Sequence, residues 1–120
     1  VLHSDDGLDE LTITAPVRVA EVDGASVREW VFDAREFGVE RGEFAAIAAR
    51  DFDEAVSIAR RLLDGERGPM REMLVLASAA ALVVGGAASE MRAGMEMARA
   101  ALDSGKARET LARLAVVSQG

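Results

Sequence analysis

Four carboxylates stand close together near the start of the chain, at Asp5, Asp6, Asp9 and Glu10. Asp9 and Glu10 are adjacent, so on a loop their oxygens can reach one hard cation, or two, from different directions. Mg²⁺ binds proteins through one or two carboxylates and completes its octahedron with water and phosphate oxygens. Gly7 would let such a loop turn tightly beside a ligand. The alternative is an acidic loop that only solvent surrounds, and the residue types alone favour this alternative.

Other side chains near this loop could also take part in chemistry. His3 stands where a short apolar strand meets the loop, a position that borders the ligand crevice in open α/β sheets. The favoured alternative for His3 is a hydrogen bond from its imidazole to the loop backbone. Thr12 and Thr14 could donate to a phosphate, and they fit equally well as polar residues of an extended segment. Asp5 and Asp6 are more typical of turns and helix caps than of metal ligands.

The composition excludes several classes of site and partner. The chain has 120 residues, no Cys and one His, which excludes disulfides, thiolate zinc sites and a cysteine nucleophile and argues against imidazole metal clusters. Its 21 acidic and 14 basic residues give a formal charge of −7, so the summed field repels nucleic acid. The most apolar stretch, residues 73–88, is shorter than the about 20 residues that span a bilayer. We therefore expect no nucleic-acid partner, no membrane insertion and a cytoplasmic protein.

Three zones of the sequence must position these residues. Residues 1–16 predict a strand followed by the acidic loop. Residues 17–32 predict a β-hairpin, because two β-rich runs flank the dipeptide Asp23-Gly24. From residue 51 to residue 117 the apolar residues recur with a helical period and predict four helices.

The helical zone carries its own start and stop signals. Asp51 or Asp53 can cap the first helix, and Gly65 can end it. The second, about residues 69–84, is apolar all round, which predicts burial on most sides. The third, about residues 88–102, and the fourth, about residues 106–117, each have one apolar face. Those faces comprise Met91, Met95, Ala98 and Leu102 in the third helix and Leu111, Leu114 and Ala115 in the fourth.

The first strand, at Val1 and Leu2, has no parallel neighbour in the rest of the sequence. Parallel strands are buried on both faces and need partners. We therefore expect its partners upstream, and expect residues 1–120 to be the C-terminal segment of a larger domain. The predicted fold class is α/β: the C-terminal part of a mostly parallel sheet flanked by helices, with a β-hairpin followed by about four helices.

Six short motifs occur in a fixed order along the chain. They are Gly7-Leu8-Asp9-Glu10-Leu11, Thr14-Ala15-Pro16, Glu36-Phe37-Gly38, Leu63-Asp64-Gly65-Glu66-Arg67-Gly68-Pro69, the stretch from Ala79 to Leu82, and Leu102-Asp103-Ser104-Gly105-Lys106-Ala107. Each motif is weak alone, but together they resemble the C-terminal third of the anthranilate phosphoribosyltransferases. The resemblance covers essentially all 120 residues.

This resemblance implies a homodimeric enzyme of tryptophan biosynthesis with a small helical domain and a larger α/β domain. The family transfers the phosphoribosyl group from phosphoribosyl pyrophosphate to the amine of anthranilate, with Mg²⁺ and release of pyrophosphate. Its metal-binding Asp-Glu pair falls on Asp9 and Glu10 here. The resemblance places the family's substrate-binding motifs before Val1, so it assigns no catalytic residue to this segment.

The sequence also departs from the family pattern at several positions. Ser4 stands where the family usually has Gly, Ala55 and Ala77 where it has Asn, and Ala49-Arg50 where it has a Gly pair. These departures keep open a non-catalytic or divergent relative that serves binding or assembly. A pyrimidine nucleoside phosphorylase, which shares the fold, is disfavoured because the Asp-Gly-Leu-Asp-Glu loop is the transferase's feature.

Overall fold

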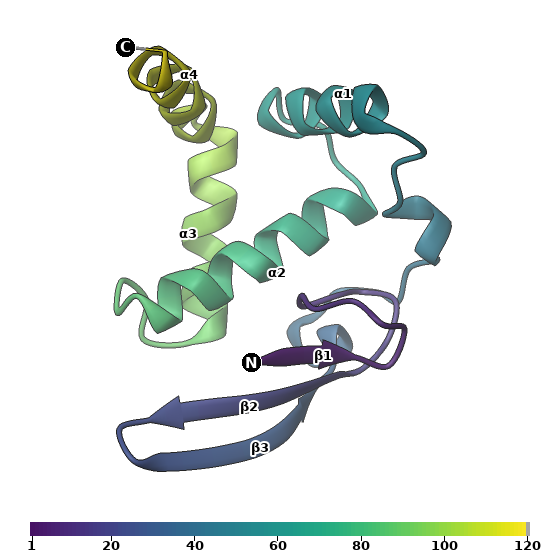
Figure 1. The fold of residues 1–120 in the computed structure, drawn as a ribbon, viewed down its shortest axis with the longest axis vertical. Helices are drawn as coiled ribbons and strands as arrows, with labels where there is room; N and C mark the ends of the chain where they lie inside the picture. Colours follow the sequence, from purple (N-terminus) through teal and green to yellow (C-terminus); the bar gives the residue numbers. More distant parts are fainter. Residues whose placement is uncertain (120) are drawn as a thin grey trace.

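A computed structural model describes residues 1–119, and its first part is a three-stranded sheet in the order β1-β2-β3 (Figure 1). The strands are β1 (Leu2–Ser4), β2 (Val17–Asp23) and β3 (Ser26–Phe32). β1 pairs antiparallel with β2, with Leu2 opposite Val19. β1 thus has an antiparallel neighbour within this chain, which the sequence does not predict, because the loop after β1 folds back and brings β2 alongside. The parallel partners expected upstream stay a prediction.

The predicted hairpin of β2 and β3 is confirmed. The two strands pair antiparallel from Val17 opposite Phe32 to Asp23 opposite Ser26, which leaves a two-residue turn. Gly24, the first residue of that turn, has φ +57°, and among residues 1–119 no residue other than glycine has a positive φ. This pattern matches a type II′ turn, whose twist suits the flanking strands.

The four predicted helices are also confirmed. They are α1 (Phe52–Leu63), α2 (Pro69–Val84), α3 (Met91–Asp103) and α4 (Lys106–Ser118), and two short 3₁₀ helices precede them, η1 (Ala34–Phe37) and η2 (Phe44–Ala46). Asp51 caps α1 by accepting from the N–H of Glu54 at 2.8 Å. Gly65 follows α1 with φ +96°, and the Glu66 N–H closes the turn on the Arg61 carbonyl at 2.9 Å.

The hydrophobic core lies between one face of the sheet and the pair α2 and α3. Val17 and Phe32 on the sheet are fully buried, as are Val75, Leu76 and Ala79 on α2. The predicted inner face of α3 is confirmed, because Met95, Ala98 and Leu102 are buried and Met91 packs against the core. These methionines therefore serve as core residues.

Helices α2 and α3 approach each other closely at Gly94. A Cβ atom built on Gly94 would lie 2.9 Å from the Ala79 carbonyl oxygen and 3.0 Å from the Ala79 Cα. Any side chain at this position would have to push α2 and α3 apart. The missing side chain of Gly94 thus sets the distance between the two helices.

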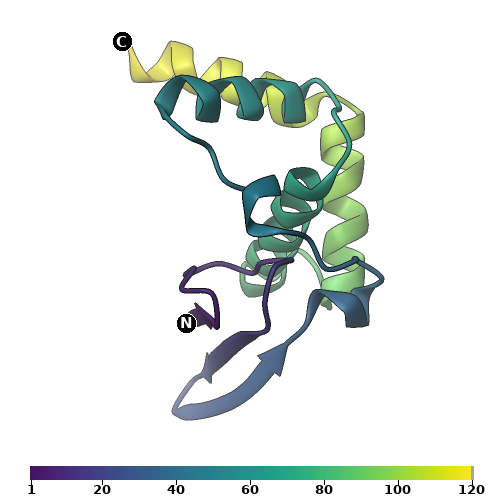
Figure 2. The ribbon, with the colours of Figure 1, turned by 90° about the vertical axis from the view of Figure 1, so that its right-hand side faces the viewer.

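Helices α1 and α4 lie at the end of the molecule opposite the sheet (Figure 2). The expected inward face of α4 is wrong: Leu111 and Leu114 are 49% and 61% exposed, and Ala115 is exposed too. Helix α2 is buried or half-buried over most of its length, as expected, and Val84 at its C-terminal end is 90% exposed. The apolar period of α4 is present, but no other element among residues 1–119 packs over that face.

The chain exposes much surface for its mass. Its accessible surface is 7984 Å², whereas a folded monomer of 12.7 kDa exposes about 6,200 Å². Its radius of gyration is 15.1 Å, against about 13.6 Å for a compact domain of this length. Within residues 1–119 there is no helix with the length and apolarity needed to cross a membrane.

Candidate metal-binding loop

The acidic loop, residues 5–16, connects β1 to β2 and is anchored in the core at its centre. Leu11 and Ile13 are 3% and 2% exposed, and Thr12 between them is fully buried. The Gly42 N–H donates to the Ile13 carbonyl at 3.0 Å and ties the loop to the segment after η1. Three consecutive buried side chains therefore fix this part of the loop, whereas the sequence predicts only an extended polar segment here.

Backbone hydrogen bonds close the first half of the loop into a tight turn. The Ser4 N–H donates to the Leu8 carbonyl at 2.8 Å, and the Gly7 N–H donates back to the Ser4 carbonyl at 3.0 Å. Gly7 has φ +91°, a conformation that favours glycine. The Asp5 N–H donates to the Pro16 carbonyl at 3.0 Å, so the two ends of the loop are joined.

Asp5 and Asp6 are engaged within the protein. The Asp5 carboxylate lies 3.4 Å from the Arg18 guanidinium. Asp6 accepts from the Leu8 N–H and from the Thr14 hydroxyl. Burial raises the pKa of Asp6, but hydrogen bonds from the Ser4 and Thr14 hydroxyls and the Leu8 N–H outweigh it and lower the pKa below its usual value. Asp6 thus acts as a turn residue, as its position in the sequence indicates.

Asp9 and Glu10 are both exposed, and no hydrogen bond or ion pair with another residue of the described chain engages their carboxylates. Half-buried Leu8 and buried Leu11 hold the backbone on either side of them. Within residues 1–119 no group of three or more metal-ligating side chains forms. The loop therefore offers two free carboxylates, which matches the number that Mg²⁺ takes when water and phosphate complete its shell.

Thr12 and Thr14 bind each other. Their hydroxyl oxygens lie 2.6 Å apart, and the Thr14 N–H donates to the Thr12 hydroxyl at 3.1 Å. With Thr14 also donating to Asp6, these hydroxyls brace the loop from inside. The geometry favours this structural role over the phosphate contact that the sequence left open.

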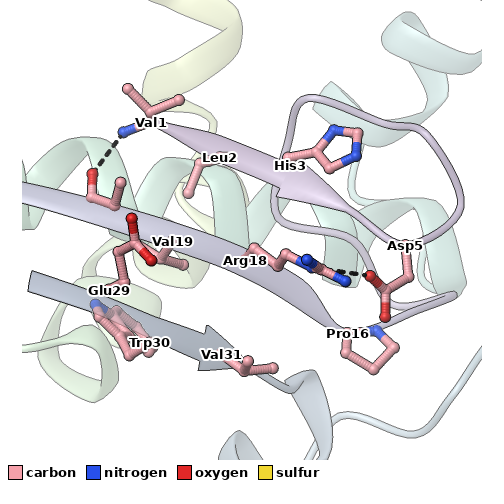
Figure 3. A pocket seen from close by; sticks show the side chains of 11 residues that line it. Val1, Leu2, His3, Asp5, Pro16, Arg18, Val19, Glu29, Trp30 and Val31 are labelled. Carbon is pink, nitrogen blue, oxygen red and sulfur yellow. Dashed lines mark hydrogen bonds and ion pairs between the residues drawn. The ribbon is translucent and has the colours of Figure 1, made fainter.

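His3 is exposed on β1, opposite Arg18 on β2. It lines an open pocket of about 530 Å³ on the outer face of the sheet, with Asp5, Arg18 and Trp30 (Figure 3). No hydrogen bond from the His3 ring to the loop backbone forms within residues 1–119, so the favoured alternative for His3 is not what the structure shows. Asp9 and Glu10 do not line this pocket.

The departures from the family pattern lie mostly away from the loop. Ser4 is fully buried, and its hydroxyl lies 3.4 Å from the Pro16 carbonyl. Arg50 precedes α1, where its N–H and its guanidinium both donate to Glu54, at 2.7 and 2.9 Å. Ala55 is exposed on α1 and Ala77 is half-buried on α2. Only Ser4 touches the loop, and it supports the turn.

Two features of the structure, the interactions of Asp33 and the burial of Arg71, are not predicted from the sequence. Asp33 accepts from the Arg35 side chain and N–H and from Arg41, and these partners lower its pKa to about 2. Arg71 is almost completely buried on α2. A lone Arg in a helical pattern gives no indication of burial, because its partners come from residues distant in sequence.

The sheet, the acidic loop and the four helices together define a known class of domain. The glycosyl transferase family, a/b domain, matches residues 1–108, and the chain belongs to this family. Anthranilate phosphoribosyltransferase of Parvibaculum lavamentivorans is 40% identical over 120 residues, which cover 100% of this chain and 35% of that protein. The enzyme of the same name from Streptomyces avermitilis is 43% identical over 123 residues, covering 98% and 35%. The chain thus spans about a third of the length of these relatives.

Solved structures agree with this assignment. The crystal structure of anthranilate phosphoribosyltransferase from Thermus thermophilus matches with a TM-score of 0.83 and 33% identity, covering 94% of this chain and 33% of that one. The Saccharomyces cerevisiae enzyme in complex with PRPP and Mg matches with a TM-score of 0.78 at 19% identity, covering 92% and 32%. The second match shows the shared fold.

Proposed function

We propose that this chain forms part of an anthranilate phosphoribosyltransferase and supplies its metal-binding pair, Asp9 and Glu10. The proposed reaction transfers the phosphoribosyl group from phosphoribosyl pyrophosphate (PRPP) to anthranilate and releases pyrophosphate. The observation that carries the proposal is the state of the four loop carboxylates. Asp5 and Asp6 are engaged by Arg18, Thr14 and the loop backbone, whereas Asp9 and Glu10 are free.

The donor set fits Mg²⁺. Both carboxylates are exposed, and no cationic side chain of the described chain pairs with them, so both stay available to a metal. Oxygen ligands in this number are typical of magnesium sites that share the ion with a phosphate substrate. The structure of the Saccharomyces cerevisiae enzyme in complex with PRPP and Mg supports the same assignment.

In the proposed reaction the anthranilate nitrogen bonds to the ribosyl carbon, and the amine gives up a proton. The bond to pyrophosphate breaks, and its electron pair leaves with pyrophosphate. Mg²⁺, when bound, supplies Lewis-acid stabilisation of the charge on the leaving pyrophosphate. Asp9 and Glu10 hold their oxygens toward solvent, while buried Leu11 and the turn at Gly7 keep the loop backbone from moving away. The proposed role of this chain is to bind the metal ion and hold it in position.

The test compares Asp9→Asn and Glu10→Gln with Asp5→Asn in the full-length protein. Asp5 is the matched control, because it removes one charge from the same loop but from a carboxylate already paired with Arg18. We expect turnover to fall by about 100-fold or more in the first two, the scale for losing charge stabilisation in a transition state. Half-saturation by Mg²⁺ should shift upward in the same two variants and stay unchanged in Asp5→Asn.

Three results would count against the proposal. Turnover equal to the wild type in Asp9→Asn at saturating Mg²⁺ would exclude the metal role. Calorimetry showing no Mg²⁺-dependent heat with PRPP would favour a non-catalytic relative. Phosphate-dependent cleavage of a pyrimidine nucleoside would favour a nucleoside phosphorylase.

The proposal extends to the setting of the enzyme. A homodimer in the cytoplasm, with PRPP and anthranilate as its small-molecule partners, follows from the resemblance to the family. The exposed apolar face of α4, together with Val84 at the end of α2, supports an association of this kind, since it leaves apolar surface for another part of the assembly. Sedimentation of the full-length protein at micromolar concentration would check the dimer, and a monomer there would contradict it.

A further inference from the structure

The chain contains three Asp-Gly dipeptides, at residues 6–7, 23–24 and 64–65, and no Asn. In an Asp-Gly dipeptide the glycine amide nitrogen can attack the side-chain carboxyl of the aspartate, because glycine has no Cβ to hinder the approach. The attack closes a five-membered succinimide ring. When the ring reopens, the chain can be left linked through the aspartate side chain, as isoaspartate. The surroundings of the three dipeptides decide which of them can react.

The first dipeptide is held inside the acidic loop. The Asp6 carboxylate accepts from the Thr14 hydroxyl and the Leu8 N–H. The Gly7 N–H donates to the Ser4 carbonyl at 3.0 Å. Because hydrogen bonds to a charged group are among the stronger ones, the carboxyl and the amide of this dipeptide are kept from meeting.

The third dipeptide is fastened between α1 and α4. The Asp64 carboxylate pairs with Arg108 of α4 at 2.9 Å. The Gly65 N–H donates to the Leu62 carbonyl at 3.1 Å, in the turn that ends α1. Here too the carboxyl and the amide each have a partner, and both interactions must break before the ring can close.

The second dipeptide lies at the tip of the β2–β3 hairpin, which projects away from the helices (Figure 1, Figure 2). Asp23 ends β2, Gly24 begins the two-residue turn, and both are exposed. Within residues 1–119 no hydrogen bond or ion pair engages the Asp23 carboxylate or the Gly24 N–H. Of the three dipeptides, this one alone has both reacting groups free.

The rearrangement that brings these groups together disturbs little of the fold. It requires rotation about the bond between the Asp23 Cα and its carbonyl carbon. This rotation breaks the hydrogen bond from the Ser26 hydroxyl to the Asp23 carbonyl, 2.8 Å long, and the last pair of the hairpin, Asp23 opposite Ser26. The next pair, Val22 opposite Val27, is 65% and 64% exposed, so no buried side chain has to move. Local opening at such a tip costs little.

We propose that Asp23-Gly24 is the site at which this chain forms isoaspartate, and that the other two Asp-Gly dipeptides resist the change. In the first step the Gly24 nitrogen bonds to the Asp23 Cγ, and a carboxyl oxygen leaves as water with the carboxyl proton and the amide proton. In the second step water adds to the former backbone carbonyl carbon of Asp23. The bond from that carbon to the Gly24 nitrogen breaks, and the nitrogen regains a proton and stays bonded to Cγ. One water leaves and one returns, so no oxidant or reductant is needed.

The product has a longer backbone and a new carboxylate at the hairpin tip. One extra methylene group enters the chain beside a two-residue turn whose length sets the hairpin register. The new carboxylate lies on the exposed tip, where a carboxyl methyltransferase that recognises isoaspartate can reach it. Such an enzyme therefore serves as a probe of the reaction.

The test ages the full-length protein at neutral pH and locates isoaspartate by peptide mapping with mass spectrometry. Methyl transfer from labelled S-adenosylmethionine by an isoaspartate methyltransferase measures the total. We expect isoaspartate at Asp23 to exceed that at Asp6 or Asp64 by about 10-fold or more, because each of the other two must first lose a charge-assisted hydrogen bond. Asp23→Glu is the matched control: it keeps the charge but would have to close a larger ring, so methyl incorporation should fall by a similar factor.

Two further variants test the restraints. Ser26→Ala removes the hydroxyl that holds the Asp23 carbonyl and should raise the rate at Asp23 by about 3-fold, the scale of one neutral hydrogen bond. Arg108→Gln frees the Asp64 carboxylate and should raise isoaspartate at Asp64 while leaving Asp23 unchanged.

The proposal is overturned if Asp6 or Asp64 isomerises as fast as Asp23 in the wild-type protein. It is also overturned if Asp23 stays unmodified over a period in which a synthetic peptide of residues 20–28 isomerises. These readouts use neither Mg²⁺ nor PRPP, so they do not depend on Asp9, Glu10 or the proposed transferase reaction.

Discussion

The two ends of the molecule differ in burial: the sheet end has a well-packed core, whereas the end formed by α1 and α4 is mostly exposed. At the sheet end, Val17, Phe32 and Leu76 are fully buried, and the acidic loop is fastened to them through Leu11 and Ile13. At the other end, no residue of α4 is buried, and α1 buries only Leu62. The candidate metal pair lies on the well-packed end, where the backbone that carries it is held in place.

The difference shows that helical pattern and burial are separate properties. Helix α4 forms with an apolar face, yet Leu114 is exposed because nothing in residues 1–119 covers it. Helix α3 has a similar pattern and is buried, because α2 and the sheet lie against it. A surface about a quarter larger than that expected for this mass follows from the uncovered faces.

The sharpest test of this contrast removes one large side chain at each end. Phe32 is fully buried and stacks on Phe37 with ring centroids 5.2 Å apart, so Phe32→Ala should cost about 3–5 kcal/mol of unfolding free energy. Leu114→Ala should cost less than about 0.5 kcal/mol, as surface changes do. Urea unfolding of a polypeptide of these 120 residues measures both. A large cost at Leu114 would mean that another copy of the chain covers α4.

The next test acts on the contact of α2 with α3. Gly94→Ala places a Cβ within 2.9 Å of the Ala79 carbonyl oxygen, so the helices must separate, at a cost of about 1–3 kcal/mol. Ala100→Ser, on the exposed side of α3, is the control and should have little effect. Thermal unfolding compares them. If Gly94→Ala were as stable as the wild type, the packed end would be looser than the structure indicates.

Acid should lower the free energy of unfolding by protonating Asp33, which directly follows β3. Hydrogen bonds from the Arg35 side chain and N–H lower the pKa of Asp33 from 3.8 to about 2. A carboxyl whose pKa is lowered by folding stabilises the protein above its unfolded pKa, and this stabilisation disappears as the pH falls from about 5 toward 2. Asp33→Asn should therefore cost about 1–2 kcal/mol at pH 7 and almost nothing at pH 2. Urea midpoints at pH 7, 4 and 2.5 check this, with exposed Glu96→Gln as the control; a cost independent of pH would contradict it.

The smallest expected effect tests the bracing of the acidic loop. Thr14→Val removes the hydroxyl that joins Thr12 to Asp6 and should cost about 1 kcal/mol. Because the loop then holds Asp9 and Glu10 less firmly, half-saturation by Mg²⁺ should rise by a few-fold in an activity assay of the full-length protein. Thr14→Ser, which keeps the hydroxyl, should restore both values. Equal Mg²⁺ dependence in Thr14→Val and the wild type would show that bracing does not matter for the metal.

The sequence by itself determined the local elements of this protein. The turn at Gly24, the cap at Asp51 and the stop at Gly65 follow from short-range rules, because each depends on the backbone of a few neighbouring residues. The adjacent Asp9 and Glu10 can be recognised for the same reason, since their chemistry is visible in two neighbouring residues. Their role as metal ligands stays a prediction.

The tertiary structure alone decided which of these elements touch. The antiparallel pairing of β1 with β2, the burial of Arg71 beside Asp103 and the approach of Gly94 to Ala79 all join residues that are distant in sequence. It also distinguishes the four loop carboxylates, because Arg18 pairs with Asp5 and the Thr14 hydroxyl donates to Asp6. The physical reason is that burial and pairing depend on residues from distant parts of the sequence, whereas a periodic sequence shows only which face of an element is apolar.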